Sequence, residues 1–532
     1  FLLLHRRRIW NTSEARWIGW ERKRGKLHEL NRLLRGATDT TFVQPDGTSP
    51  PIAAGVRYVV TLDADTRLPR DTVRRLIGKM AHPLNRPSFD VRVGRVVEGY
   101  AVLQPRVTPS LPIGQEGSLF QRIFSSVSGI DPYAAAVSDV YQDLFGEGSY
   151  TGKGIYDVDA FEAALSGRVP DSTLLSHDLF EGIFARAGLA SDVEVVEEFP
   201  ARYDVGALRH HRWARGDWQL LPWILGRGRN SAQPGRTSAG IPALGRCKML
   251  DNLRRTLSAP AAVLALLAGW AAPFDAALVW TGFVLSTIVL PTLIPIIGAI
   301  PPRRPGPTMA SHVRALGNDF QLALTLSALI VTFLGHQAWL MGDAIVRTLW
   351  RLRVSRRHLL EWVPAAQATI GRRLDLVGFV CRMAGSLVIA ATAMAVVQFS
   401  EHGSWTLVAP IALLWITAPA VALWTSLPPG AADQLDASDI DARALRLTAR
   451  RTWRFFEDFV GADDHMLPPD NFQEDPTPVL AHRTSPTNLG LYLLSVVSAR
   501  DFGWIGTAEA IARLEATLGT MGELAKFRGH FF

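Results

Sequence analysis

Two carboxylates, one residue apart, follow an apolar segment near the start of the chain. In "RYVVTLDADTRLP", residues 57–69, the run 58–62 is followed by Asp63 and Asp65. Such a run predicts a buried parallel strand, and open α/β sheets bind ligands at the carboxyl ends of their strands. Two carboxylates there repel each other unless a cation lies between them, so they indicate a Mg²⁺ or Mn²⁺ site. The alternative is a turn, since Asp is common in turns and at helix N-caps.

A second pair of acids could supply proton transfer. "LLSHDLFEGIFARAG" places Asp178 at the start of a predicted helix and Glu181 one turn later on the same face. A cation that neutralises a diphosphate leaving group needs such a base beside it to activate an acceptor hydroxyl. Spacing alone does not choose between the two acids. Asp178 is preferred because free backbone N–H groups at a helix start stabilise a carboxylate, although it could simply cap the helix.

Cationic and aromatic residues alternate in "LRHHRWARGDWQ", which contains Arg212 and Trp213. The planar fork of an arginine suits a diphosphate, and a tryptophan offers a sugar ring a flat apolar face. The alternative is an anchor at a membrane surface, where such residues also gather. The glycines of "GEGSYTGKG", Gly148 among them, lack the spacing of an ATP-binding phosphate loop. They are expected to let the backbone approach a sugar closely.

The first 255 residues show the pattern of a soluble α/β domain. A helix is predicted over 13–36, with Ser13 as its N-cap and Gly36 at its end. Further strands are predicted at 95–104 and 193–203, and helices near 72–80, 118–130, 157–166 and 176–188. Because strands alternate with helices, we expect a doubly wound, mostly parallel sheet.

Residues 256–430 have the composition of a helical transmembrane domain. Only Asp275 is charged in the stretch 257–299, which predicts two spans. The segment 320–350 predicts either a tilted hairpin or one span with an interfacial helix at 351–370, and 375–399 and 404–427 supply two more spans. We expect about six crossings or their re-entrant equivalent.

Charge sets the expected orientation of these spans. The arginines at 302–304 and 351–357 predict cytoplasmic loops, and the turn 400–404 is then periplasmic. The net charge of +7 comes from arginines that flank apolar runs, so it indicates a lipid bilayer and no nucleic acid. Two distant cysteines, Cys247 and Cys381, argue against a disulfide framework or a zinc site.

Residues 431–532 return to soluble character. An amphipathic helix, a polar loop and a second helix capped near Thr487 or Asn488 predict the start of an all-helical domain. His482 and Arg483 in this segment are expected to pack the loop and not to bind a ligand. Since the chain starts at Phe1 and stops without a closing element, we expect it to be a fragment of a longer protein.

Several long segments carry a resemblance to a known family. Residues 9–255 resemble the core of processive, membrane-integrated family-2-type glycosyltransferases in the order of their motifs: Asp-x-Asp, a base-carrying acid, then Arg-Trp ahead of the spans. "WERKRGKLHELNRLLRG", "FGEGSYTGKGIYDVDAF", "SRRHLLEWVPAAQ", "LPPDNFQE" and "AHRTSPTNLGLYLLS" together resemble the cyclic β-1,2-glucan synthases, the glycosyltransferase family 84 type. The resemblance covers nearly all 532 residues.

The resemblance implies specific roles. Asp63 and Asp65 correspond to the acids that hold the metal and diphosphate, and Asp178 to the catalytic base. Arg212 and Trp213 correspond to the end of a Gln-x-x-Arg-Trp motif whose first position is Arg209 here, which leaves open how the acceptor is gripped. Lys26 is a further candidate substrate contact, unless it is an ordinary solvated helix lysine. An acid that contacts uracil would lie upstream of Phe1.

The resemblance implies an inverting, GT-A-like enzyme of the bacterial inner membrane with its catalytic domain in the cytoplasm. It would extend a growing β-1,2-glucan acceptor from UDP-glucose with Mg²⁺ or Mn²⁺, and 431–532 would begin a glycoamylase-like domain. Another processive β-glucan synthase is the nearest alternative. A glycoside hydrolase or phosphorylase would have its paired carboxylates beyond Phe532. A coupled transporter needs intramembrane charges that the spans mostly lack.

Overall fold

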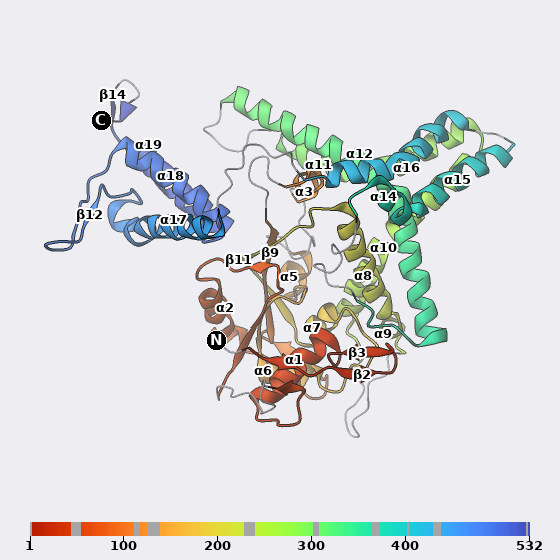
Figure 1. Cartoon of the computed structure of the whole chain (residues 1–532), viewed down its shortest axis with the longest axis horizontal. Helices are drawn as coiled ribbons and strands as arrows, with labels where there is room; N and C mark the ends of the chain where they lie inside the picture. The colour runs from red at the N-terminus through yellow and green to blue at the C-terminus, as the bar shows by residue number, and fades with distance from the viewer. Residues whose placement is uncertain are drawn as a thin grey trace.

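The computed structural model describes residues 3–43, 55–110, 117–125, 139–227, 240–301, 308–362, 373–401, 404–428, 438–527 and 530–531. Figure 1 shows an α/β part that contains the N-terminus, a group of long helices beside it, and a smaller helical part near the C-terminus. The arginines 302–304, the turn residues 402–403 and the predicted boundary at 430 lie outside the described residues.

A five-stranded sheet forms the centre of the α/β part, in the order β5 (Tyr58–Thr61), β10 (Gly154–Asp157), β9 (Val102–Pro109), β11 (Ala187–Glu197) and β6 (Thr66–Arg67). Only β9 and β11 are parallel; β10 is antiparallel to β5 and β9, and β6 is antiparallel to β11. The prediction of a mostly parallel sheet is therefore wrong, and the sheet is mixed. The reason is the direction of β10: Ile155 pairs with Leu103 and the next residue, Tyr156, pairs with the preceding residue, Val102, so β10 runs opposite to β9.

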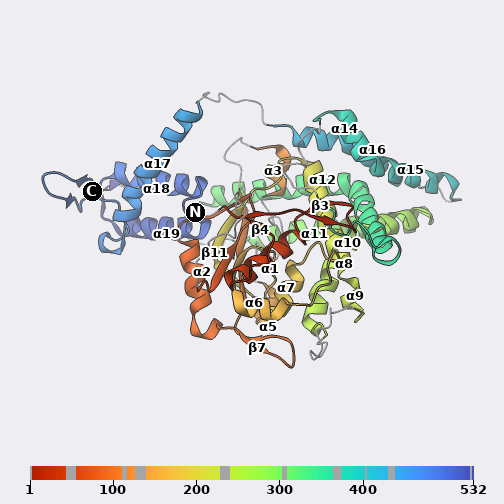
Figure 2. The same ribbon diagram turned by 60° about the horizontal axis from the view of Figure 1, so that its bottom comes forward.

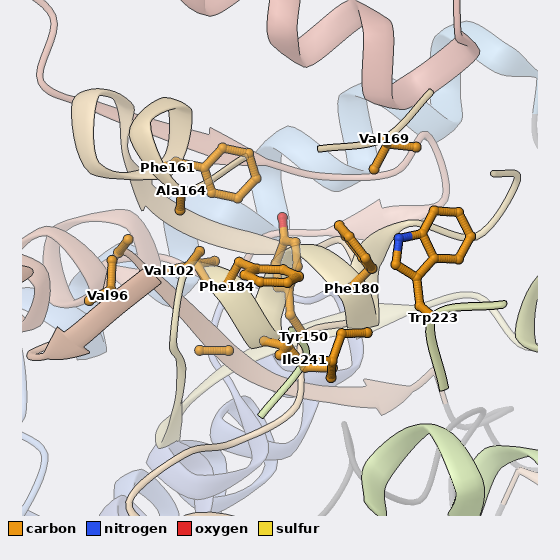
Figure 3. Packing of buried hydrophobic residues seen from close by; sticks show 14 of the residues in the cluster. Val96, Val102, Tyr150, Phe161, Ala164, Val169, Phe180, Phe184, Trp223 and Ile241 are labelled. Carbon is orange, nitrogen blue, oxygen red and sulfur yellow. The ribbon is translucent and has the colours of Figure 1, made fainter. Parts of the chain in front are cut away.

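The helices of this part lie against the sheet and enclose its core. They are α1 (Arg22–Leu34), α2 (Thr72–Ala81), α3 (Leu119–Phe124), α5 (Val140–Phe145), α6 (Val158–Leu165), α7 (Asp178–Phe184), α8 (Tyr203–Gln219) and α9 (Leu221–Ile224). Figure 3 shows aromatic side chains meeting in that core, and the rings of Phe180 and Trp223 cross edge to face with centroids 5.6 Å apart. Each fully buried side chain of this size contributes roughly 1.5–3 kcal/mol, so the core fixes α7 against the sheet.

Three predicted elements differ in their bounds. The predicted helix 13–36 begins at Arg22, because the preceding residues form the hairpin β2 (Ile9–Asn11) and β3 (Arg16–Ile18). The predicted strand 95–104 is interrupted at Gly99, whose φ of +62° ends β8 (Arg95–Glu98), the partner of β7 (Ser88–Asp90). The predicted strand 193–203 ends at Glu197, and Tyr203 already starts α8.

Long apolar helices fill the next part of the chain: α10 (Ala243–Trp270), α11 (Phe274–Ala299), α12 (Met309–Trp350), α14 (Leu376–Arg382), α15 (Ala384–Phe399) and α16 (Trp405–Ser426). Among the described residues three helices are long and apolar enough to cross a membrane, α11, α12 with its extension to Ser355, and α16. The pair α14 and α15, bent by 65°, would make a fourth. The described residues therefore hold three or four candidate spans, where about six crossings were expected.

The difference from six crossings lies in α10 and α12. The expected first span occupies only the end of α10, which starts in the α/β part and continues through the predicted boundary at 255. The expected hairpin at 320–350 is one continuous helix, because no proline interrupts 309–350. At about 1.5 Å per residue α12 is about 63 Å long, twice the hydrocarbon thickness of about 30 Å. Only part of α12 can therefore lie within a bilayer.

The apolar helices pack directly on the α/β part. Ala214 of α8 shares a buried cluster with Met341 and Ala344 of α12, and the Tyr203 hydroxyl lies 2.8 Å from His336 Nδ1. The Tyr203 amide donates to Ser426 Oγ at the end of α16. Helix α8, which contains the Arg-Trp motif, thus packs on α10, α12 and α16, and its Arg209 pairs with Glu197 of the sheet (Figure 2).

The C-terminal part is mainly helical, as expected. It contains α17 (Asp439–Phe459), α18 (Pro486–Asp501), α19 (Thr507–Glu523) and two short hairpins, β12 (Phe472–Gln473) with β13 (Val479–Leu480) and β14 (Lys526–Phe527) with β15 (His530–Phe531). His482 and Arg483 pair with aspartates of the same part, Asp464 and Asp470. Its contact with the sheet is polar, because Glu194 of β11 accepts a hydrogen bond from the Thr507 amide.

Candidate active site

Three strand ends meet at the carboxyl end of β5. The register pairs Gly154 at the start of β10 with Thr61, the last residue of β5, and Glu197 at the end of β11 with Thr66. Asp63 and Asp65 lie in the short connection between β5 and β6. The antiparallel entry of β10 therefore brings the segment just before Gly154 to the same edge as the two aspartates.

Two lysines neutralise Asp63. Lys23 Nζ of α1 lies 2.7 Å from Asp63 Oδ1, and Lys153 Nζ lies 3.0 Å from Asp63 Oδ2. Burial by itself would raise the pKa of Asp63, but the two ammonium groups hold that pKa well below its usual range. Asp63 is therefore a carboxylate at any physiological pH.

A third carboxylate joins the two predicted ones. Ligand oxygens of Asp63, Asp65 and Glu197 all lie within 4.8 Å of one another, close enough to share one cation. Three carboxylates suit Mg²⁺ or Mn²⁺, which prefer oxygen ligands. The chemistry of this donor set fits the expected divalent ion. Glu197 was not predicted from the sequence.

Asp178 is the first residue of α7 and borders the same edge. Its Oδ1 is buried and makes no hydrogen bond within the described part of the chain, whereas the side chain as a whole is 27% exposed. A Cβ on Gly152 would lie 2.6 Å from Asp178 Oδ1, and the φ of Gly152 is +85°. Since the Gly152 carbonyl also accepts from Lys23 Nζ at 2.9 Å, Gly152 and Lys23 link the base candidate to Asp63.

Glu181 is occupied elsewhere. His177 Nδ1 lies 2.8 Å from Glu181 Oε1 and 3.5 Å from Asp178 Oδ1, and His177 and Glu181 are both buried. Burial alone would lower the pKa of His177, but the charges of Glu181 and Asp178 raise it above its usual value. His177 contacts both acids, and because Glu181 is buried while Asp178 is partly exposed, Asp178 is the more accessible of the two.

Arg209 links the Arg-Trp motif to the strand ends. Its guanidinium pairs with Glu197 Oε1 and lies 5.0 Å from the centre of the Trp213 ring. Glu197 Oε2 in turn lies 3.0 Å from Lys153 Nζ. An unbroken series of charges, from Lys23 through Asp63, Lys153 and Glu197 to Arg209, therefore joins α1 to α8.

Arg212 is held near the carboxylates without pairing to them. Burial, and then the charge of Arg209, lower the pKa of Arg212 to about 10, so it stays cationic at neutral pH. Its guanidinium lies 5.8 Å from the ring centre of Trp362, and Arg22 contacts the same ring at 5.5 Å. Trp362 ends the segment 358–362, in which the Leu360 amide donates to Glu14 Oε1. Sequence reasoning quoted this segment but assigned it no role.

Two further predicted residues have different surroundings. Lys26 is exposed on α1, and it is Lys23, one turn earlier, that contacts Asp63. Gly148 is buried, with its carbonyl accepting from Lys248 Nζ at 2.7 Å and its amide donating to Ala187. Gly152 is the glycine beside Asp178. A substrate contact by Lys26 or Gly148 stays a prediction.

A known protein aligns with the whole of this chain. The chain is 50% identical over 534 aligned residues to cyclic β-(1,2)-glucan synthase NdvB of Rhizobium meliloti (strain 1021). The resemblance to the cyclic β-1,2-glucan synthases is confirmed. The match covers 100% of this chain, whereas the chain spans 18% of the length of the relative. No family model matches the chain.

Sequence reasoning missed Lys23, Lys153, Glu197 and His177. Each one contacts a predicted residue, but only His177 does so within a local segment: Lys153 is 90 positions after Asp63, and Glu197 is 12 positions before Arg209. The only sequence sign was local. Lys153 stands between two glycines in a segment already noted for its glycines, and His177 directly precedes Asp178.

Proposed function

We propose that this chain contains the transferase site of a cyclic β-1,2-glucan synthase, a GT-A-like inverting glycosyltransferase that adds glucose from UDP-glucose to a β-glucan acceptor. One observation carries the proposal: contacts join the metal-type acids, the candidate base and the Arg-Trp helix at the end of β5, through Lys23, Gly152 and the Arg209–Glu197 pair. The identity to a curated cyclic β-(1,2)-glucan synthase supports the same activity.

Asp178 would act as the base. Its partly exposed carboxylate would accept the proton of the acceptor 2-hydroxyl as the hydroxyl oxygen attacks the anomeric carbon, while the bond to the diphosphate breaks on the opposite face. One displacement on an α-linked donor yields a β-linked product. Gly152 keeps the wall beside Asp178 free of a side chain, so acceptor and base can approach each other closely.

The diphosphate would be stabilised by charge. Asp63, Asp65 and Glu197 would hold the Mg²⁺ or Mn²⁺ ion, which supplies charge neutralisation for the leaving group when bound. The charges of Asp63 and Asp178 both act on Arg212. Arg212 would contact the diphosphate, since an arginine can bind phosphate oxygens bidentately. Trp213, on the same helix, would face the acceptor sugar.

The long helices would place this site at the inner membrane, with the α/β part in the cytoplasm. Outward side chains of α11, such as Leu278, Phe283 and Ile294, are large, apolar and exposed, which suits contact with lipid. Helices α15 and α16 form a hairpin whose α16 end returns to Tyr203 in the α/β part. This supports a periplasmic position for the turn near residue 400.

The test uses membranes from cells that express the full-length protein. They should convert UDP-[¹⁴C]glucose into material that only a β-1,2-glucanase degrades. Membranes carrying Asp65→Asn at equal protein level should lose about 10²-fold or more of that activity. A product degraded by a cellulase instead would show another processive synthase, and half or more of wild-type activity in the variant would remove the metal assignment.

A further inference from the structure

Lys153 is a buried cation in the place where a metal ion is expected. Its Nζ lies 3.0 Å from Asp63 Oδ2 and 3.0 Å from Glu197 Oε2, and its side chain is only 7% exposed. The backbone next to it is fixed, since Gly154 has a φ of +144° and a Cβ there would lie 2.2 Å from the Leu103 carbonyl oxygen. The ammonium group is therefore held by the fold between two carboxylates.

Each of these two carboxylates divides its oxygens between two cations. Asp63 offers Oδ1 to Lys23 and Oδ2 to Lys153, whereas Glu197 offers Oε1 to Arg209 and Oε2 to Lys153. Lys23 and Arg209 thus lie at the two ends, and Lys153 occupies the middle. If Lys153 moved away, one oxygen of each acid would be released while the outer pairs stayed intact.

We propose that Glu197 is a third carboxylate ligand of the divalent cation and that Lys153 is a built-in counter-cation, which the metal displaces when it enters with the donor diphosphate. The inference rests on the proposed function and deepens it. Without a metal, Lys153 prevents the mutual repulsion of Asp63, Asp65 and Glu197. Once displaced, its ammonium group has the diphosphate as its new anionic partner.

This arrangement couples the two ligands. A metal ion that binds alone must displace Lys153 without giving the lysine another anionic partner. The affinity of the protein for the metal alone should therefore be low. A nucleoside diphosphate supplies that partner, and therefore metal and diphosphate should strengthen each other's binding by the same factor. Lysine is a common phosphate ligand as a point charge, which suits this exchange.

The experiment measures Mn²⁺ affinity of the purified full chain from the EPR signal of free Mn²⁺, with and without UDP. Wild type should bind Mn²⁺ weakly alone and at least about tenfold more tightly with UDP. Glu197→Gln should weaken binding about tenfold or more in both conditions. Lys153→Met should bind Mn²⁺ alone more tightly than wild type and lose the effect of UDP. Glu198→Gln, which changes the exposed neighbour, should match wild type.

The two variants should change Mn²⁺ affinity in opposite directions. This result distinguishes a lysine that competes with the metal from a lysine that only supports the structure of the site. Unchanged Mn²⁺ affinity in Glu197→Gln, or weaker Mn²⁺ binding in Lys153→Met, would overturn the inference, as would a wild type that binds no Mn²⁺. If Lys153→Met does not fold, Lys153→Gln tests the same loss of charge. A chain that shows the expected Mn²⁺ pattern but forms no glucan from UDP-glucose would refute the proposed function and leave this inference standing.

Discussion

Replacing Asp178 by Asn tests which of the two acids of α7, Asp178 or Glu181, acts as the base. The change preserves size and shape at the first residue of the helix, where one carboxylate oxygen has no hydrogen bond within the described residues. An amide cannot accept the acceptor's proton, and loss of a general base costs about 10²–10⁴-fold in rate. At about 1.36 kcal/mol per tenfold, the barrier should rise by about 2.7–5.4 kcal/mol.

Glu181→Gln should have the contrasting effect. Glu181 is buried 2.8 Å from His177, so this variant breaks a buried charge pair and leaves the imidazole without its nearest counter-charge. Removing one partner of such a pair destabilises a protein by about 3–5 kcal/mol. We therefore expect a less stable protein whose folded fraction still transfers glucose within about tenfold of wild type.

Three measurements on each variant make the comparison: initial transfer rate from UDP-[¹⁴C]glucose, UDP binding by calorimetry, and thermal unfolding of the detergent-extracted chain. Asp178→Asn should keep UDP binding and the unfolding temperature while turnover collapses. The assignment fails if Glu181→Gln abolishes turnover without loss of stability while Asp178→Asn stays active. In that case Asp178 is a helix-start residue and Glu181 is the base.

Three further perturbations test other parts of the structure. Gly152→Ala should reduce transfer about 10²-fold or more, because its Cβ would meet the carboxylate of Asp178, the proposed base. Gly36→Ala has a similar φ of +87° with open space around it and should stay active. Because the pKa of His177 is raised in the folded protein, its protonation stabilises the fold below about pH 6.5, and this contribution is lost as the pH rises through the raised pKa. The thermal unfolding temperature should therefore fall between about pH 6 and pH 9. His177→Gln should lack this fall. An impermeant thiol reagent should label a cysteine at Glu401 in intact cells and not one at Val354, and the reverse pattern would overturn the proposed orientation.

Sequence patterns predicted the elements that carry long, regular signals. The strand before Asp63, the helix that starts at Asp178 and the long apolar helices all occur, because periodicity and apolar runs are local properties. Strand β10 escapes prediction because it has four residues, begins at a glycine and continues directly into α6. Its antiparallel direction, together with that of β6, makes the sheet mixed. It also brings Lys153 to the site.

The number and length of the membrane helices also could not be predicted from local patterns alone. An apolar run shows that a segment can enter a bilayer, but it does not show where a helix begins, bends or ends. The start of α10 packs in the α/β part, and the end of α12 packs on α8, so both helices exceed the apolar runs within them. Contacts with the α/β part, which no local pattern reports, decide these lengths.

The arginine in place of the expected glutamine shows how the site's parts depend on one another. A glutamine at position 209 could not neutralise a buried carboxylate, whereas Arg209 pairs with Glu197 and also lies over Trp213. The arginine and Glu197 are thus matched: an uncompensated charge on either side would be costly in a buried place. Because Glu197 also contacts Lys153, which contacts Asp63, Arg209 ties the position of Trp213 to these two carboxylates. The departure from the family motif therefore gives the helix that contains Trp213 a direct electrostatic connection to Asp63.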